Sequence, residues 1–277
     1  MNLLKFIPES LLGYIAQHPQ FSKILENIGW LFFDKILRMG LGLLIGVWIA
    51  RYLGPEQFGL LSFSIAFTWL FGAVSTLGLP EIVVRDLVRK PDTKFETLGT
   101  TAALLLLGGV LTYCLMLITI FWVRPDDLLA KILVAILGST MLFKASEIAV
   151  YWFESQVISK YTVWVQNGSF LIFAGIKVLL ILNGTPLIAF AWATLAEAIV
   201  AAVVLSIMFG LNGPSPQQLC VSLRHAQILL KDSWPLLLSS IAVVVYMKVD
   251  QIMLGQMVGD EAVGIYSAAV RISEVWY

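Results

Sequence analysis

The chain has 277 residues, of which 59% are hydrophobic and 13% are charged, and its mean hydropathy is +0.87. Soluble proteins are about half apolar and about a quarter charged, so this composition excludes a soluble domain and indicates an integral membrane protein. The net charge at pH 7 is zero, and the chain therefore lacks the basic field that would predict binding to nucleic acid.

The sequence holds no motif that carries enzyme or cofactor chemistry. Two cysteines (Cys114, Cys220) and two histidines (His18, His225) lie far apart, which argues against a metal site, a haem or a disulfide framework. Neither a phosphate-binding loop nor a nucleophile elbow occurs. We therefore expect no catalytic residue, no metal and no cofactor, and a membrane enzyme is the least favoured class of function.

The first 28 residues mix charged side chains with short apolar groups and lack the long apolar core of a cleavable signal. We interpret residues 1–28 as an amphipathic segment on the cytoplasmic surface of the membrane. The first apolar span after it would then act as its own insertion signal.

Apolar windows of about 20 residues, the length that a helix needs to cross roughly 30 Å of hydrocarbon, follow in regular succession. They cover residues 29–50, 58–80, 98–122, 131–152, 161–182, 186–208 and 233–255, and an eighth begins near residue 262. The predicted fold is an all-α integral membrane protein of MATE-like type. It has a six-span lobe at residues 29–208 and, at residues 233–277, the first helix and part of the second helix of another lobe.

Three segments between or within the spans have distinctive patterns. Residues 79–90 read as a basic amphipathic helix that continues the second span, where anionic lipids would attract it or where its cations only set topology. Turn formers make residues 209–232 a cytoplasmic linker, whose amphipathic second half should lie along the membrane before Pro235 starts the seventh span. Gly42 and Gly46 form a small-xxx-small pair suited to close helix packing.

A short motif occurs at two places and predicts an internal repeat. Residues 53–62 read LGPEQFGLLS, and residues 258–267, which lie 205 positions later, read VGDEAVGIYS. Each copy stands between two apolar segments, so each is interpreted as the turn that leaves one membrane helix and enters the next. The matching positions are Gly54, Glu56 and Gly59 in the first copy and Gly259, Glu261 and Gly264 in the second.

Lysine and arginine predict the orientation, since cytoplasmic loops retain positive charge during insertion. With the N-terminus inside, nine cations fall in cytoplasmic segments and three fall outside. The nine are Lys5, Lys23, Arg85, Arg89, Lys90, Lys94, Lys160, Arg224 and Lys231, and the three are Arg51, Arg124 and Lys131. This bias predicts a cytoplasmic N-terminus.

Charged side chains inside spans are costly and usually face a cavity or a partner, so they are the candidates for function. We expect a cationic cavity suited to a phosphate or pyrophosphate group, formed by Arg38, Lys177, Lys248 and Arg271. The candidates for ion coupling are Asp34, Glu197 and Asp250. Glu197 lies near mid-membrane, where a carboxyl is a candidate proton site unless a cation pairs with it.

An alternative explanation of these charges, in which they have no functional role, stays open. Near a membrane face, snorkelling or a local ion pair explains Asp34, Lys35, Lys144 and Glu147 without function. The amines of Lys177 and Lys248 could likewise reach the outer interface. The eighth predicted span, which begins near residue 262, contains a further charged residue, Glu274.

Three stretches together resemble a known family. They are residues 48–62 (WIARYLGPEQFGLLS), residues 77–81 (LGLPE), and residues 248–271 (KVDQIMLGQMVGDEAVGIYSAAVR). In these stretches and their spacing the chain is similar to the polysaccharide flippases of the multidrug/oligosaccharidyl-lipid/polysaccharide (MOP) exporter superfamily. The family's pattern continues beyond the entrance of the second lobe, so we expect this chain to be truncated at its C-terminus.

The resemblance implies a two-lobe transporter in the cell inner membrane that works by alternating access. It implies movement of an undecaprenyl-pyrophosphate-linked oligosaccharide from the inner to the outer leaflet, driven by a proton or sodium gradient. The implied partners are the lipid-linked oligosaccharide, membrane lipids and the glycosyltransferase or polymerase machinery.

Two alternatives remain beside the flippase. A multidrug-type exporter of the same superfamily would favour an acidic cavity, but the spans hold six cations and five acids, and this margin does not decide. A non-transporting membrane partner of polysaccharide assembly is the other alternative, because a truncated chain could assemble with other proteins and move nothing itself.

Overall fold

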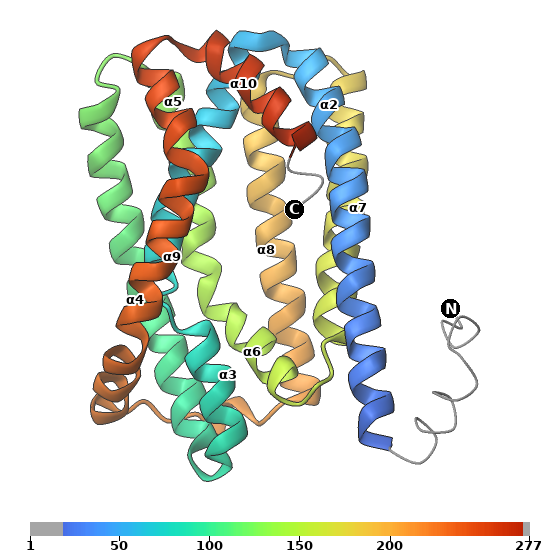
Figure 1. Ribbon diagram of the computed structural model, residues 1–277, viewed down its shortest axis with the longest axis vertical. Helices are drawn as coiled ribbons and strands as arrows, with labels where there is room; N and C mark the ends of the chain where they lie inside the picture. Colours follow the sequence, from blue (N-terminus) through green and yellow to red (C-terminus); the bar gives the residue numbers. More distant parts are fainter. Residues whose placement is uncertain (1–18, 274–277) are drawn as a thin grey trace.

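The computed structural model describes residues 19–273, and every regular element in that range is helical (Figure 1). The elements are α2 (Pro19–Ser75), α3 (Pro80–Arg89), η2 (Pro91–Thr93), α4 (Lys94–Val123), α5 (Leu128–Gly138), η3 (Ser139–Glu147), α6 (Ile148–Ser155), α7 (Lys160–Leu182), α8 (Leu187–Asn212), η4 (Pro216–Gln218), α9 (Leu223–Met257) and α10 (Asp260–Ser273). Of residues 1–28, which the sequence predicts to be an amphipathic surface segment, residues 1–18 lie outside the described residues, as does the charge of Glu274. Residues 19–28 form the first part of α2.

Six segments within residues 19–273 are long and apolar enough to cross a membrane. The first of them, Asn27–Arg89, contains the first two predicted spans. The helices stand side by side and run alternately up and down the bundle (Figure 1). The predicted fold class, an all-α multi-pass membrane protein, is confirmed.

The long helix α2 is two antiparallel halves joined at a sharp turn (Figure 1). At the turn Gly54 has φ +74° and ψ 170°, a conformation that is open to glycine because it has no Cβ. Pro55 follows, and a proline suits the first position of a helix because its missing N–H would have no partner there. The turn at Gly54 therefore separates the first predicted span from the second.

The connections between helices gather at two ends of the bundle (Figure 1). We call one the repeat-turn end, where the turn within α2, the connection of α4 to α5 and the connection of α9 to α10 lie (top of the figure). The other is the basic end, where α3 and the start of α9 lie (bottom of the figure). The loops that were predicted to be cytoplasmic thus share one end, and the assignment of that end to the cytoplasm stays a prediction.

Helix α3 does not continue the second span, so that expectation is wrong. α2 ends at Ser75, and both Leu77 (φ 54°) and Gly78 (φ 64°) adopt the left-handed conformation before α3 begins at Pro80. A Cβ on Gly78 would lie 2.5 Å from the backbone nitrogen of Leu237. The helix is interrupted at this turn, and α9 can approach it so closely because residue 78 has no Cβ.

The expectation that Pro235 starts the seventh span is also wrong. α9 begins twelve residues earlier, at Leu223, and passes through Pro235. The Ser222 side chain accepts a hydrogen bond from the backbone N–H of His225 (3.3 Å), which is the usual N-cap arrangement. The cap fixes the start of the helix, so the predicted surface segment and the seventh span form one helix.

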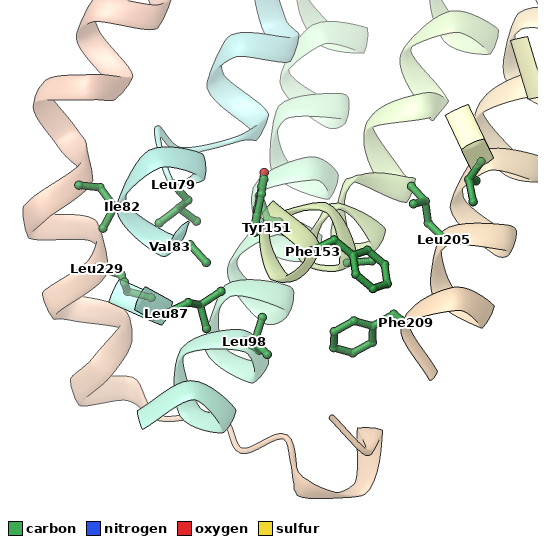
Figure 2. Close-up of a cluster of buried hydrophobic side chains, with 13 residues drawn as sticks. Leu79, Ile82, Val83, Leu87, Leu98, Tyr151, Phe153, Leu205, Phe209 and Leu229 are labelled. Carbon is green, nitrogen blue, oxygen red and sulfur yellow. The ribbon is translucent and has the colours of Figure 1, made fainter. Parts of the chain in front are cut away.

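A hydrophobic cluster at the basic end joins helices from across the sequence (Figure 2). Its members come from α3 and the residue before it, and from α4, α6, α7, α8 and α9: Leu79, Ile82, Val83, Leu87, Leu98, Leu105, Ala149, Tyr151, Phe153, Val165, Leu205, Phe209 and Leu229. Each buried aliphatic or aromatic side chain of this size contributes about 1.5–3 kcal/mol when water is the alternative. The cluster holds α3 and the start of α9 against α4, α6, α7 and α8.

The fourth predicted span is irregular in its middle, where η3 separates α5 from α6. The hydroxyls of Ser139, Thr140 and Ser146 each donate to the carbonyl three residues earlier, at 2.6 to 2.8 Å. A 3₁₀ stretch of this length is uncommon within a helix and often marks a hinge. The span therefore bends where it packs on α4 and α8.

Candidate functional site

Lys177 and Glu197 form an ion pair between neighbouring helices. Lys177 Nζ on α7 lies 2.8 Å from Glu197 Oε2 on α8, and the side chains are 17% and 21% exposed. Glu197 therefore has the cationic partner that the sequence left open. Two opposite charges cancel when they pair, which lowers the cost of holding either inside a membrane.

The hairpin of α7 and α8 explains how these two side chains meet. Lys177 lies about 7 Å before the end of α7 and Glu197 about 15 Å after the start of α8, at 1.5 Å per residue. Two long side chains bridge this offset because the helices are antiparallel neighbours. Opposite charges on two helices that are joined by a short loop are the sequence signal that could have predicted the pair.

A second ion pair lies on the first half of α2. Arg38 Nε donates to Asp34 Oδ1 at 2.8 Å, one helical turn away. The Arg38 guanidinium also lies over the ring of Phe170 on α7, 5.6 Å from its centroid. The two residues that the sequence placed on one face are thus directly paired, and the pair faces α7.

The other candidate cations, Lys248 and Arg271, lie against α2. Lys248 Nζ is 5.7 Å from the ring centroid of Trp69. The guanidinium of Arg271 lies over Phe58 at 5.3 Å, and a Cβ on Gly46 would come within 1.9 Å of its Nη1 atom. Gly46 thus makes room for the Arg271 side chain, which is a different role from the helix packing predicted for it.

The last candidate for ion coupling, Asp250, is held by neighbouring donors. It accepts hydrogen bonds from the Tyr266 hydroxyl of α10 and from the backbone N–H of Gln251, the latter at 2.7 Å. The candidates therefore contact different helices: Lys177 meets α8, whereas Lys248 and Arg271 meet α2.

A further polar group lies in the irregular fourth span. Lys144 Nζ lies 2.6 Å from Glu147 Oε1, and the hydroxyl of buried Tyr151 donates to Glu147 Oε2 at 3.0 Å. The sequence offered a local ion pair for the first two residues, but the tyrosine was missed. Its spacing of four residues from Glu147 was the available signal.

The two repeat turns cross each other with their backbones in contact. A Cβ on Gly59 would lie 1.7 Å from the carbonyl oxygen of Asp260, and a Cβ on Gly264 would lie 2.0 Å from that of Pro55. Asp260 occupies in the second copy the position that Pro55 occupies in the first. The contact is therefore reciprocal, as expected where two related helices pack through small residues.

Arg124 secures this crossing from the side. Its guanidinium contacts Asp260 at 2.6 and 2.9 Å, Asp127 at 3.0 Å and the carbonyl of Gly255 at 3.0 Å, and lies over the ring of Phe63. Burial lowers the pKa of Arg124, but the hydrogen bonds to the two carboxylates outweigh burial and keep the pKa above its ordinary value. Arg124 is thus a permanent cation between α4, α9 and α10.

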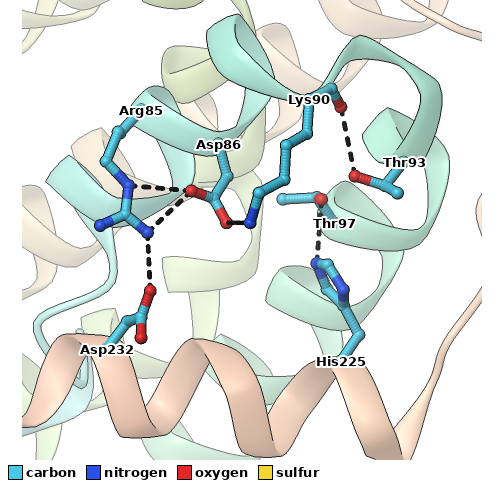
Figure 3. A network of polar contacts seen from close by, with 7 residues as sticks. All are labelled: Arg85, Asp86, Lys90, Thr93, Thr97, His225 and Asp232. Carbon is cyan, nitrogen blue, oxygen red and sulfur yellow. Dashed lines mark hydrogen bonds and ion pairs between the residues drawn. The ribbon is translucent and has the colours of Figure 1, made fainter.

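At the basic end a polar network joins α3 and α4 to α9 (Figure 3). Arg85 Nη2 lies 2.8 Å from buried Asp86 and 2.7 Å from Asp232 of α9, and Lys90 is 3.4 Å from Asp86. His225 Nε2 lies 3.0 Å from the Thr97 hydroxyl. These contacts fix the first turns of α9 on α3 and α4.

Comparison with known proteins places this arrangement in a family. The sequence matches the family described as "Polysaccharide biosynthesis protein" over residues 24–276. The chain belongs to the polysaccharide biosynthesis protein family. No match was found among curated proteins.

A solved structure shares the fold of this polysaccharide biosynthesis protein. It is described as the "Inward-facing conformation of a multidrug resistance MATE family transporter of the MOP superfamily", and the TM-score is 0.62 at 15% sequence identity. The similarity covers 90% of this chain, which spans 61% of the length of that transporter. The resemblance that the sequence motifs indicated is confirmed: this is a multi-pass membrane protein with the fold of a MOP-superfamily transporter.

Proposed function

We propose that this chain belongs to a flippase that moves an undecaprenyl-pyrophosphate-linked oligosaccharide from the inner to the outer leaflet of the cell inner membrane. The observation that carries the proposal is the combination of a polysaccharide biosynthesis family with a transporter fold. A biosynthetic pathway that builds a glycan on a lipid inside the cell needs a membrane step to expose it outside. The N-terminus would lie in the cytoplasm.

The paired charges support a role in the binding and release of the cargo phosphate. A pyrophosphate needs cations, and both Lys177 and Arg38 already have carboxylate partners, Glu197 and Asp34. An incoming phosphate would compete with either carboxylate for its cation. Return of the carboxylate to the cation would expel the phosphate, so the ion pair and the bound cargo exclude each other.

Complementation tests the proposal. The gene that encodes this chain is expressed in a bacterial strain that lacks its own oligosaccharide flippase, and surface polysaccharide is measured by immunoblot. We expect surface polymer to return. If the product inserts into the membrane and lipid-linked oligosaccharide still accumulates in the inner leaflet, the flippase proposal is wrong. A gain of drug resistance without surface polymer would identify a multidrug-type exporter instead.

The pair of Lys177 and Glu197 gives a sharper prediction. Lys177→Met should reduce flipping at least tenfold because the phosphate loses its cation, whereas Glu197→Gln should keep cargo binding because no carboxylate then competes for Lys177. Flipping is measured in inverted vesicles, with and without an imposed pH gradient. Arg51→Gln, at an exposed position of the repeat-turn end, is the matched control for loss of one charge. Unchanged transport in both variants, at equal expression, would remove the pair from the mechanism.

A further inference from the structure

The first turns of α9 have one face that is docked on the first lobe. His225, Leu229 and Ser233 are buried on this face. His225 contacts Thr97 of α4, and Asp232 at its edge pairs with Arg85 of α3 (Figure 3). This face therefore has its partner within the chain.

The opposite face of the same turns presents apolar side chains and two cations. Leu223 is 83% exposed, Trp234 57% and Leu238 55%. At 100° per residue these three positions and Lys231 fall within one sector of the helix, with Arg224 beside them. Both cations are exposed, and among residues 19–273 no carboxylate lies within ion-pair distance of either.

The depth of this face in the membrane indicates what covers it. α9 is a membrane-crossing helix by length and hydropathy, and most of its exposed side chains past Trp234 are apolar, Leu238 among them. Tryptophan favours the level of the lipid headgroups, so the turns before Trp234 lie in the interfacial layer. There Leu223 can enter the acyl region, while Arg224 and Lys231 lie at the depth of the phosphates.

Charge complementarity identifies the kind of lipid. Asp232 is the nearest carboxylate in the sequence, and its 2.7 Å contact with Arg85 offsets its charge. Arg224 and Lys231 therefore present net positive charge toward the bilayer, and such cations attract anionic headgroups. A zwitterionic headgroup carries its own cation and gains far less from this contact.

We propose that residues 223–234 form a binding surface for anionic phospholipids, in which Arg224 and Lys231 contact the headgroup phosphates and Leu223 and Trp234 insert beside the acyl chains. The surface is separate from the transport of cargo. It ties α9, the first helix beyond the linker, to the lipid on one face and to α3 and α4 on the other, so the lipid composition stabilises one position of this helix.

Native mass spectrometry of the purified chain in detergent tests the surface. Phosphatidylglycerol and phosphatidylcholine are titrated separately, and the affinity of the first bound lipid is measured. The unaltered chain should bind phosphatidylglycerol more tightly, and Arg224→Gln with Lys231→Gln should weaken that binding roughly tenfold to thirtyfold and leave phosphatidylcholine unchanged. Arg224→Lys should retain the preference, and Arg51→Gln with Lys131→Gln, which removes equal charge at the other end, should not alter it.

Circular dichroism first checks that each variant has the helix content of the unaltered chain, which we expect because both cations are exposed. If the double variant binds phosphatidylglycerol as tightly as the unaltered chain, or if the unaltered chain shows no preference, the proposal is wrong. Loss of a dimer without loss of lipid binding would assign the surface to a second copy of the chain. None of these results depends on transport, so the lipid surface and the flippase proposal can fail separately.

Discussion

Replacing Gly59 with alanine should disrupt the crossing of α2 and α10, whereas replacing Gly72 in the same helix should not. The new Cβ would lie 1.7 Å from the carbonyl oxygen and 2.6 Å from the carbonyl carbon of Asp260. These are backbone atoms, which cannot move away by a change of rotamer. Overpacking of this kind costs about 1–3 kcal/mol and sometimes more, and we expect a loss of about 3 kcal/mol in the free energy of unfolding.

The measurement is unfolding in detergent, followed by circular dichroism against denaturant. A Cβ added to Gly72 would meet no heavy atom within 4 Å, so Gly72→Ala controls for the change in helix propensity and should be neutral or slightly stabilising. Gly264→Ala should resemble Gly59→Ala because it meets the carbonyl of Pro55. A Gly59→Ala chain as stable as the Gly72→Ala chain would show that the two turns do not pack as described.

The fold was largely predictable because a helix that crosses a membrane requires a long apolar segment, which is easily recognised in a sequence. An apolar window long enough to cross the bilayer needs no tertiary information, since every backbone polar group inside lipid must be bonded within its own helix. The sequence was misleading where two signals competed. Pro235 is typical of a helix start, but Ser222 caps the helix earlier. At Leu77 the sequence contained no feature that predicts its positive φ angle.

The candidate site was less predictable, because a pattern identifies charged residues but not their partners. Asp34 and Arg38 lie one turn apart, so local geometry was enough to place them on one face. Lys177 and Glu197 stand on different helices, and their pairing depends on the register of a hairpin. The contact of Arg271 with Gly46 joins residues more than 200 positions apart, and only the fold brings them together.

The repeat motif holds two kinds of glycine, which the sequence alone did not distinguish. Gly54 and Gly259 have φ angles of +74° and +115° and make the turns. Gly59 and Gly264 lie inside the helices that follow and let the backbones touch. The motif therefore encodes both a reversal of the chain and the contact between its two copies, which is why the same spacing recurs.

Removing the charge of Arg124 should destabilise the same crossing by a different route. In Arg124→Met the carboxylate of Asp260, 19% exposed, loses both of its guanidinium contacts, and the carbonyl of Gly255 loses its donor. Loss of one partner from a buried ion pair costs about 3–5 kcal/mol, and the partial exposure of these groups reduces the figure to about 2–3 kcal/mol. Denaturant unfolding in detergent measures this loss.

A double-mutant cycle separates the pair from the packing of the long side chain. Asp260→Asn leaves Arg124 with Asp127, so it should cost less than Arg124→Met. The double variant should be more stable than the sum of the two losses predicts, because residue 260 then carries no charge that lacks a partner. Asp127→Asn is the matched control. The Asp127 side chain also caps α5 by accepting a hydrogen bond from the backbone N–H of Ala130 at 2.9 Å, and asparagine caps a helix equally well. Asp127→Asn therefore removes only a more exposed charge, and it should cost under about 1 kcal/mol. Additive losses for Arg124 and Asp260 would mean that their contact does not hold α10 in place, and that the glycine crossing alone secures the repeat-turn end.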